Sequence, residues 1–253
     1  MKKINLLFSF TIMKYFAIEH SRNEKLVGKI PQVKEFIHHC NVDEEPKFID
    51  RFIFEEIKIQ PILSNVILYS NAKQTDFIDT YGHIGFLSGY LISNKFKEIL
   101  DKFNCYGFQF FQTYFIQKNQ KLDNYWQVNK YDFPYQFIDF IKTTFIFKDR
   151  DVNKNVISKV MNFKNADEFK SFANQIRYPK WLFSEDIFFT EEMNLDFFSL
   201  RYTDGAHKGI VSERLKVEIE KETITGIEFR PIEISLQEWG KRDGLREKTY
   251  GKT

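Results

Sequence analysis

Two stretches of the chain match each other without a gap, and this internal repeat constrains the fold more than any other feature. Residues 91–110 read LISNKFKEILDKFNCYGFQF, and residues 210–229 read IVSERLKVEIEKETITGIEF. We interpret the match as two copies of one structural unit, over residues 89–112 and 208–231, rather than as chance convergence of two ordinary units. The identical positions are Ser93 and Ser212, Lys97 and Lys216, Lys102 and Lys221, Gly107 and Gly226, and Phe110 and Phe229.

Each copy is predicted to form a strand, a helix and a second strand. The serine, Ser93 or Ser212, follows an apolar strand end, where its hydroxyl can cap the free N–H groups of a helix. Gly107 stands where the first helix must end, since glycine adopts the left-handed C′ position at little cost. Phe108 and Phe110 then alternate as in a strand. Such a unit fits a right-handed crossover between parallel strands.

These units predict an α+β fold (mixed α/β), in which helices pack on a twisted mixed sheet. Length allows one large domain or two small ones, and we expect a single domain over residues 1–253. Apolar residues follow Lys2 and Lys3 up to Met13, but a small-residue cleavage site does not follow them. The run is too short to span a bilayer. We expect an N-terminal strand there, or a start at Met13 that makes residues 1–12 an extension.

Charge and cysteine content exclude several classes of function. The net charge is +2, so a strong field that would attract nucleic acid is absent. Cys40 and Cys105 lie far apart in the sequence, which indicates a reducing compartment and a cytoplasmic protein. Residues 240–253 carry five Lys/Arg against two Asp/Glu, and we interpret them as a solvated basic tail.

Other elements follow from local patterns. Strands are predicted over residues 15–18, 52–54, 57–59 and 66–68, and a hairpin turn at Thr203-Asp204-Gly205. A short helix is predicted to begin at Pro31, with Val33, Phe36 and Ile37 on its apolar face. A longer helix is predicted over residues 163–177, with Asn165 as its N-cap and Glu168 at the third helical position.

Three groups of residues suggest a site. Asp50, Glu56 and Lys58 have the residue types of a metal-dependent nuclease, with carboxylates for Mg²⁺ and a lysine beside the attacking water. The alternative is alternation along a half-exposed strand. His38-His39-Cys40 offers metal-type side chains, but adjacent helical residues point in different directions and cannot share one ion. Any of the three tryptophans could anchor a partner, although core packing explains each of them as well: Trp126, Trp181 and Trp239.

Residues 210–216 and 226–231 also resemble the C-terminal signature of a family of bacterial immunity proteins, the eleventh-numbered immunity family of polymorphic toxin systems. The resemblance extends from residue 13 to most of the chain and is strongest over 197–231. It implies a cytosolic protein that binds and blocks the toxin domain of a secreted effector by steric occlusion. Its partner would thus be neither nucleic acid nor membrane. We expect no catalytic, cofactor-binding or metal-binding residues; the alternatives are the nuclease and a structural scaffold.

Overall fold

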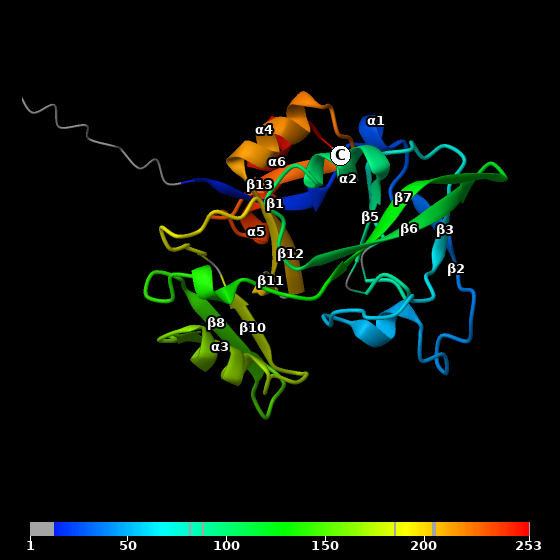
Figure 1. Ribbon diagram of the computed structural model, residues 1–253. Helices are drawn as coiled ribbons and strands as arrows, with labels where there is room; N and C mark the ends of the chain where they lie inside the picture. The colour runs from blue at the N-terminus through cyan, green and yellow to red at the C-terminus, as the bar shows by residue number, and fades with distance from the viewer. Residues whose placement is uncertain (1–12, 81, 88, 185, 204–205, 253) are drawn as a thin grey trace, which may run out of the picture.

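The chain forms two β-sheets with short helices packed on them (Figure 1). A computed structural model describes residues 13–80, 82–87, 89–184, 186–203 and 206–252. The expectations for residues 1–12 and for the turn at Asp204-Gly205 therefore lie outside the described residues. Within those ranges, no helix has the length and apolarity that a membrane span requires.

The first sheet, sheet A, has seven strands, which come from both ends of the chain and from its middle. Only β10 and β11 pair in parallel; the other neighbours are antiparallel. In spatial order the strands are β13 (Ile227–Pro231), β1 (Tyr15–His20), β12 (Ala206–Ser212), β11 (Phe197–Thr203), β10 (Trp181–Ser184), β8 (Phe145–Arg150) and β9 (Val156–Met161).

The second sheet, sheet B, has six strands, and the pair β3 and β6 is parallel. In order these are β2 (Val33–Ile37), β3 (Asn65–Leu68), β6 (Phe108–Gln117), β7 (Gln120–Lys130), β5 (Tyr90–Ser93) and β4 (Phe77–Ile78). The α-helices are α1 (Glu24–Val27), α2 (Asn94–Leu100), α3 (Ala166–Ala173), α4 (Glu213–Lys221), α5 (Leu236–Trp239) and α6 (Leu245–Tyr250); two 3-10 helices are η1 (Ile49–Phe52) and η2 (Tyr135–Phe137). Mixed sheets with packed helices confirm the predicted α+β class.

The two repeated segments form β5-α2-β6 in sheet B and β12-α4-β13 in sheet A. Within each segment the two strands run in the same direction, but they are not neighbours. The strand β7 lies between β5 and β6, and β1 lies between β12 and β13, antiparallel to both in each case. The segments thus lie in different sheets with the same local arrangement.

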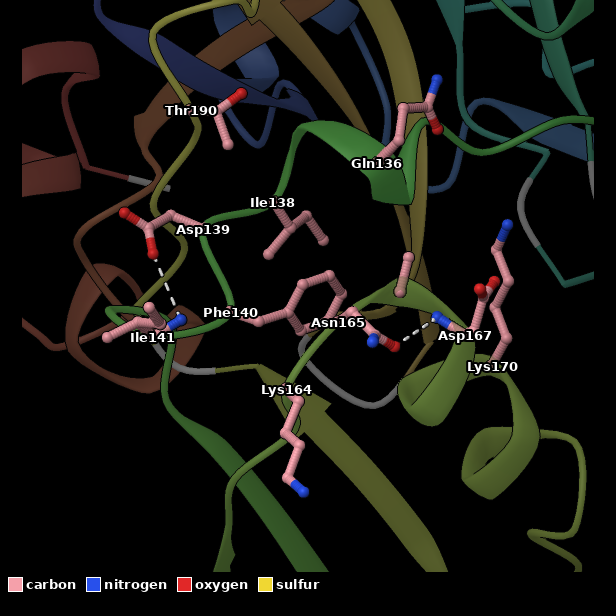
Figure 2. Close-up of a pocket in the computed structure, with 11 residues that line it drawn as sticks. Gln136, Ile138, Asp139, Phe140, Ile141, Lys164, Asn165, Asp167, Lys170 and Thr190 are labelled. Atoms are coloured by element: carbon pink, nitrogen blue, oxygen red, sulfur yellow. Dashed lines mark hydrogen bonds between the residues drawn. The ribbon is translucent and has the colours of Figure 1, made fainter.

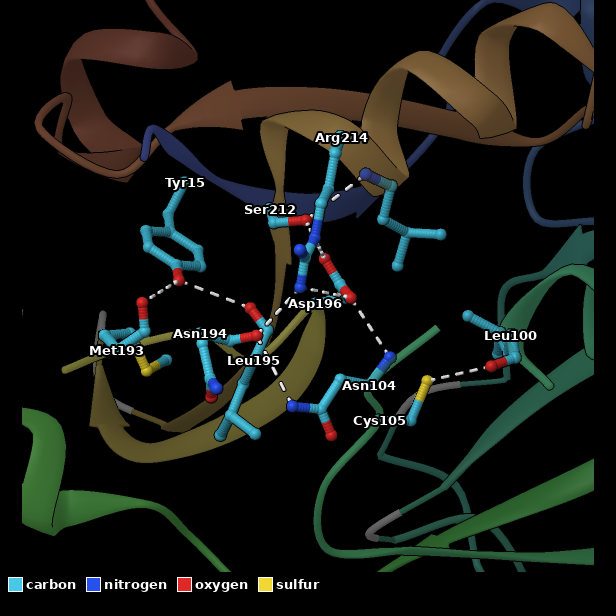
Figure 3. Close-up of polar contacts among 11 residues, drawn as sticks. Tyr15, Leu100, Asn104, Cys105, Met193, Asn194, Leu195, Asp196, Ser212 and Arg214 are labelled. Carbon is cyan, nitrogen blue, oxygen red and sulfur yellow. Dashed lines mark hydrogen bonds and ion pairs between the residues drawn. The ribbon is translucent and has the colours of Figure 1, made fainter. Parts of the chain in front are cut away.

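A serine and an aspartate begin each helix in the same way. Ser93 Oγ accepts a hydrogen bond from the N–H of Phe96 at 3.1 Å and donates to Asp76 at 2.6 Å. Ser212 Oγ accepts from the N–H of Leu215 at 3.2 Å and donates to Asp196 at 2.5 Å. Asp196 also accepts from the guanidinium of Arg214 (Figure 3). The aspartate therefore orients the hydroxyl that caps the helix.

The same two aspartates join the segments to each other. Asp76 accepts from the N–H and the hydroxyl of Thr225, both at 2.8 Å, in the loop after α4. Asp196 accepts from the N–H of Asn104 at 3.0 Å, in the loop after α2. One apolar core is shared between the segments and includes Phe77, Phe96, Leu100, Phe197, Leu215 and Ile219. The aspartate that orients the serine of one segment thus also binds the loop of the other segment.

Three local predictions were wrong. Residues 33–37 form the strand β2, because pairing with β3, such as Glu35 with Ile67, overrides their helical spacing. Residues 52–54 end a 3-10 helix, and the positive φ of Phe54, 63°, marks a turn. Residues 57–59 form no ladder; Ile57 instead exchanges hydrogen bonds with the side chain of Gln109. Here the β-forming residues pack instead of pairing: Ile57 joins a cluster with Phe48 and Ile49, and the ring of Phe54 packs on that of Phe133.

Other local predictions are confirmed, although the helix predicted over residues 163–177 is shorter, since α3 covers Ala166–Ala173. Strands β1 and β3 include residues 15–18 and 66–68. The side chain of Asn165 caps α3 by accepting from the N–H groups of Asp167 and Glu168. Glu168 reaches back to the N–H of Lys164, one residue before the cap. The strands β11 and β12 pair antiparallel, as the hairpin prediction requires.

Candidate functional site

The predicted nuclease residues do not assemble into a metal site. The carboxylate of Asp50 accepts from the backbone N–H groups of Gly85 and Leu87, and its burial raises its pKa. Glu56 and Lys58 are exposed and pair with each other at 3.7 Å. Among the described residues, no group of three or more His, Cys, Asp or Glu side chains is placed to hold a metal ion.

The other suspected groups have structural contacts. His38 Nδ1 lies 2.8 Å from Ser64 Oγ, and His39 Nε2 lies 2.6 Å from Asn65 Oδ1, so the two rings bond to different side chains. The hydroxyls of Ser93 and Ser212 are used as helix caps. Burial raises the pKa of the Cys105 thiol to about 12, which keeps it protonated and unreactive at neutral pH.

An open surface lies at the far end of sheet A, where β10, β8 and β9 extend away from the rest of the molecule together with α3 (Figure 1). One face of these strands packs on α3: the rings of Phe145 and Phe147 contact those of Phe169 and Phe172. Residues that pair directly across strands share a face. The opposite face, which we call the outer face, therefore carries Ile146, Lys148, Arg150, Val156, Ser158, Val160, Trp181 and Phe183.

The outer face combines apolar and basic side chains. Val156 and Val160 are each 58% exposed, and Arg150 is exposed as well. The other outer-face residues of β8 and β10 are half-buried: Ile146, Lys148, Trp181 and Phe183. The ammonium of Lys148 lies 4.9 Å from the ring centroid of Phe183, and the guanidinium of Arg150 lies 5.8 Å from that of Trp181. Exposed apolar residues with aromatic and arginine anchors are typical of protein-binding surfaces.

Positive charge dominates the hairpin of β8 and β9. Residues 145–161 contain four Lys/Arg and two Asp. Asp149 pairs with Lys180 at 3.9 Å, and Asp151 accepts hydrogen bonds from Asn153 and Asn155 within the turn. The cations of Lys148 and Arg150 thus lack a carboxylate partner among the described residues. This surface suits a partner with acidic groups.

An open hollow of about 660 Å³ lies on the α3 side of the same region (Figure 2). Two of its polar lining side chains have partners within the protein: Asp139 pairs with Lys142 at 2.8 Å, and Asn165 caps α3. Lys164 and Lys170 also line it. The arrangement resembles no nucleophile–base pair, so we assign the hollow no chemistry.

A buried lysine lies elsewhere, at the end of β7. Lys130 is 0% exposed, and its amine has no hydrogen-bond partner among the described residues. Burial lowers the pKa of Lys130 well below its usual value. The amine lies 3.8 Å from the centroid of the Tyr90 ring, a contact that favours the ammonium. A ring face contributes about 2 kcal/mol, less than the several kcal/mol that desolvation of an ion costs, so the ring contact does not reverse the lowering of the pKa of Lys130.

Replacing Lys130 by methionine is expected to stabilise the protein at pH 7 more than at pH 9.5. Between the lowered pKa and the ordinary value of about 10.4, the unfolded chain binds a proton that the folded chain does not. Stability of the parent protein therefore falls as pH decreases through this range, by up to about 1.4 kcal/mol per pH unit. Urea unfolding at both pH values measures the free energy of unfolding of the parent protein and of Lys130→Met, and the exposed Lys58→Met serves as control. If this free energy depends on pH in the same way for the parent and for Lys130→Met, the prediction is wrong.

Sequence reasoning considered only Trp181 on the outer face, as one of three tryptophans. Trp239 is buried, and the indole N–H of Trp126 donates to Asn94 at 3.0 Å. The signal that could have revealed the surface is the alternation of Ile146 and Lys148 with the aromatic residues Phe145 and Phe147. Which face stays open depends on the position of α3.

A known protein family matches most of the chain. The model of the Immunity protein family (Imm11) matches residues 37–234, and this range includes both repeated segments and the outer face. Among curated proteins, none matches the sequence. The match confirms the resemblance found in residues 210–231. Since the matched range covers well over half of the sequence, the chain belongs to the Imm11 immunity protein family.

Proposed function

We propose that this protein neutralises a cognate toxin of a polymorphic toxin system by binding it in the cytoplasm of the cell that makes both. Membership of the Imm11 family is the observation that carries this proposal. The mechanism is steric: a rigid surface of one folded domain covers the site of the toxin, and the immunity protein performs no chemistry. The open, apolar and basic outer face supports the proposal, because it offers the kind of surface that protein partners bury.

Affinity purification from the native bacterium tests the proposal. The tagged protein should capture, in stoichiometric amount, a large secreted protein or its C-terminal fragment, which mass spectrometry identifies. Expression of that fragment alone in a heterologous bacterial host should stop growth, and co-expression of the immunity protein should restore it. A preparation without partner, from cells shown to make the toxin, would contradict the proposal and favour a scaffold role.

The double substitution Lys148→Glu/Arg150→Glu is expected to weaken binding of the captured toxin fragment by about 100-fold, or about 2.7 kcal/mol. Both cations lie on the outer face and stack on aromatic rings there, so the change reverses the local charge and loosens two anchors. Calorimetry measures the dissociation constant. The control Lys34→Glu/Lys58→Glu reverses two exposed charges elsewhere and should leave affinity unchanged. Equal losses for both double variants would show that only net charge matters.

A further inference from the structure

We infer that β9 is the edge at which an acidic, extended segment of the toxin adds as the next strand of sheet A. This inference rests on the proposed function and specifies the surface and the kind of partner segment. Strand addition to an open sheet edge gives affinity through backbone hydrogen bonds, and the flanking side chains give specificity. Four features of the described residues carry it: the state of the sheet edges, the direction of the β9 amides, the outer face and its charge.

The four sheet edges differ in how well they are protected. The edge of β13 is covered by α6, where the N–H of Phe229 donates to the hydroxyl of Tyr250 at 2.8 Å. The strand β4 has two residues, and the N–H of Phe77 is bonded to the carbonyl of Thr225 at 3.1 Å. The register of β2 shifts between Val33 and Glu35, which makes that edge irregular. Short strands, irregularities and covers are the ordinary protections of an edge.

The edge of β9 has none of these protections among the described residues. Its six residues pair with β8 in an unbroken register from Val156 to Met161. Five of the six are exposed. The strand contains no proline. Lys159 is the single charged residue within it. An exposed, regular edge of this length is a template for another strand.

The hairpin geometry shows which β9 amides are available. The N–H of Asp151 donates to the carbonyl of Asn155 at 2.9 Å, and the carbonyl of Asp151 accepts from the N–H of Lys154 at 2.9 Å, so the backbone bonds of Asp151 close the hairpin at the start of the ladder. Bonded and non-bonded pairs alternate along an antiparallel ladder. Residues 157, 159 and 161 therefore bond to β8, and the N–H and C=O groups of Val156, Ser158 and Val160 point away from it. The outward backbone groups thus belong to the residues whose side chains lie on the outer face.

Charge decides between two occupants of this edge. A second copy of the chain would place its own basic hairpin, with four Lys/Arg against two Asp, beside the first one. Like charges across such a pairing are destabilising. A segment rich in Asp or Glu would instead meet complementary charge on both faces of the sheet, from Lys148 and Arg150 on the outer face and from Lys159 on the α3 face, where it pairs with Phe147. The edge therefore fits an acidic strand of the toxin.

Ser158→Pro is the substitution that tests strand addition. Proline removes the central outward N–H of β9 but leaves the hydrogen bonds of residues 157 and 159 to β8 intact. Ser158→Ala is the matched control, since it removes the hydroxyl and keeps the N–H. We expect Ser158→Pro to weaken binding of the captured toxin fragment by about 10- to 100-fold. Ser158→Ala should bind as the parent protein does.

Hydrogen exchange of the parent complex tests strand addition without any substitution, so misfolding of the Ser158→Pro variant cannot affect the result. In the parent complex, the amides of residues 156, 158 and 160 should exchange at least about 10-fold more slowly than in the free protein, and the amides of β2 should not change. Unaltered exchange in β9 within a complex that does form would overturn the inference and leave the proposed function standing. Affinity that rises with salt would overturn the acidic character of the segment. If the toxin fails to bind at all, both proposals fail.

Discussion

Replacing Gly226 by alanine is expected to destabilise the protein by about 3–5 kcal/mol, enough to unfold a marginally stable chain. Gly226 follows α4 and has a φ of +88°, a conformation that costs a residue with a side chain about 1–2 kcal/mol. An added Cβ would also lie 2.3 Å from the carbonyl oxygen of Phe77. Because that oxygen belongs to the backbone of β4, neither Gly226 nor Phe77 can move without disturbing the contact between β4 and the second repeated segment.

The control for this prediction is Gly82→Ala. Gly82 has a similar φ of +78°, but nothing lies within 4 Å of an added Cβ. Its replacement should cost only the backbone term of about 1–2 kcal/mol. Urea unfolding measures both variants. Equal losses would mean that the close approach of β4 to the loop after α4 contributes nothing, and that the reciprocal contact between the segments is looser than the structure indicates.

The second large effect is expected at the C-terminal helix. Replacing Arg246 by methionine should cost about 3–5 kcal/mol, because it leaves a carboxylate buried without its cation. Arg246 is 4% and Glu228 1% exposed as side chains, and two guanidinium nitrogens donate to the carboxylate at 2.7 and 2.8 Å. Glu228 also accepts from the hydroxyl of Ser21 and the N–H of Arg22. The pair thus holds α6 against β13 and β1.

Two further variants separate charge from packing. Arg246→Met combined with Glu228→Gln removes the charge and keeps an acceptor for Ser21 and Arg22, so it should recover part of the loss. The exposed pair of Lys252 and Asp243 provides the control, because Lys252→Met should change stability by less than about 1 kcal/mol. Thermal unfolding measures the stability of all these variants. If Arg246→Met loses no more stability than Lys252→Met, the buried pair of Arg246 and Glu228 is dispensable for folding.

This ion pair also corrects the interpretation of residues 240–253 as a solvated tail. The basic residues there are not equivalent: Arg246 is buried, whereas Lys241, Arg242 and Lys252 are exposed. The sequence does not distinguish these basic residues, because it does not show that Glu228, the second residue of β13, requires a cation. The Imm11 match ends at residue 234, before α5 and α6 begin.

The sequence by itself determined the features that depend on neighbouring residues. Serine caps, the Asn165 cap and the alternation of a strand act over a few residues, so their patterns are visible without a fold. The alignment of the two segments found Ser93 and Ser212 for this reason. It missed Asp76 and Asp196, because these lie 17 and 16 residues before their serines and the one-residue difference breaks an ungapped match. The prediction that Gly107 ends a helix was wrong: α2 ends at Leu100 with Asp101 as its C-cap, and the positive φ of Gly107 belongs to the bend before β6.

Only the tertiary structure decided which strands pair with one another and in which sheet each repeated segment lies. The strand β7 lies between the two strands of the first segment, and β1 lies between those of the second. These placements, the division into two sheets and the strand at residues 33–37 all depend on partners far away in the sequence. The open edge of β9 is a consequence of the same kind, because a strand is an edge only when no other segment pairs with it. Backbone hydrogen bonds are alike in every strand, so the choice of partner depends on packing over the whole molecule.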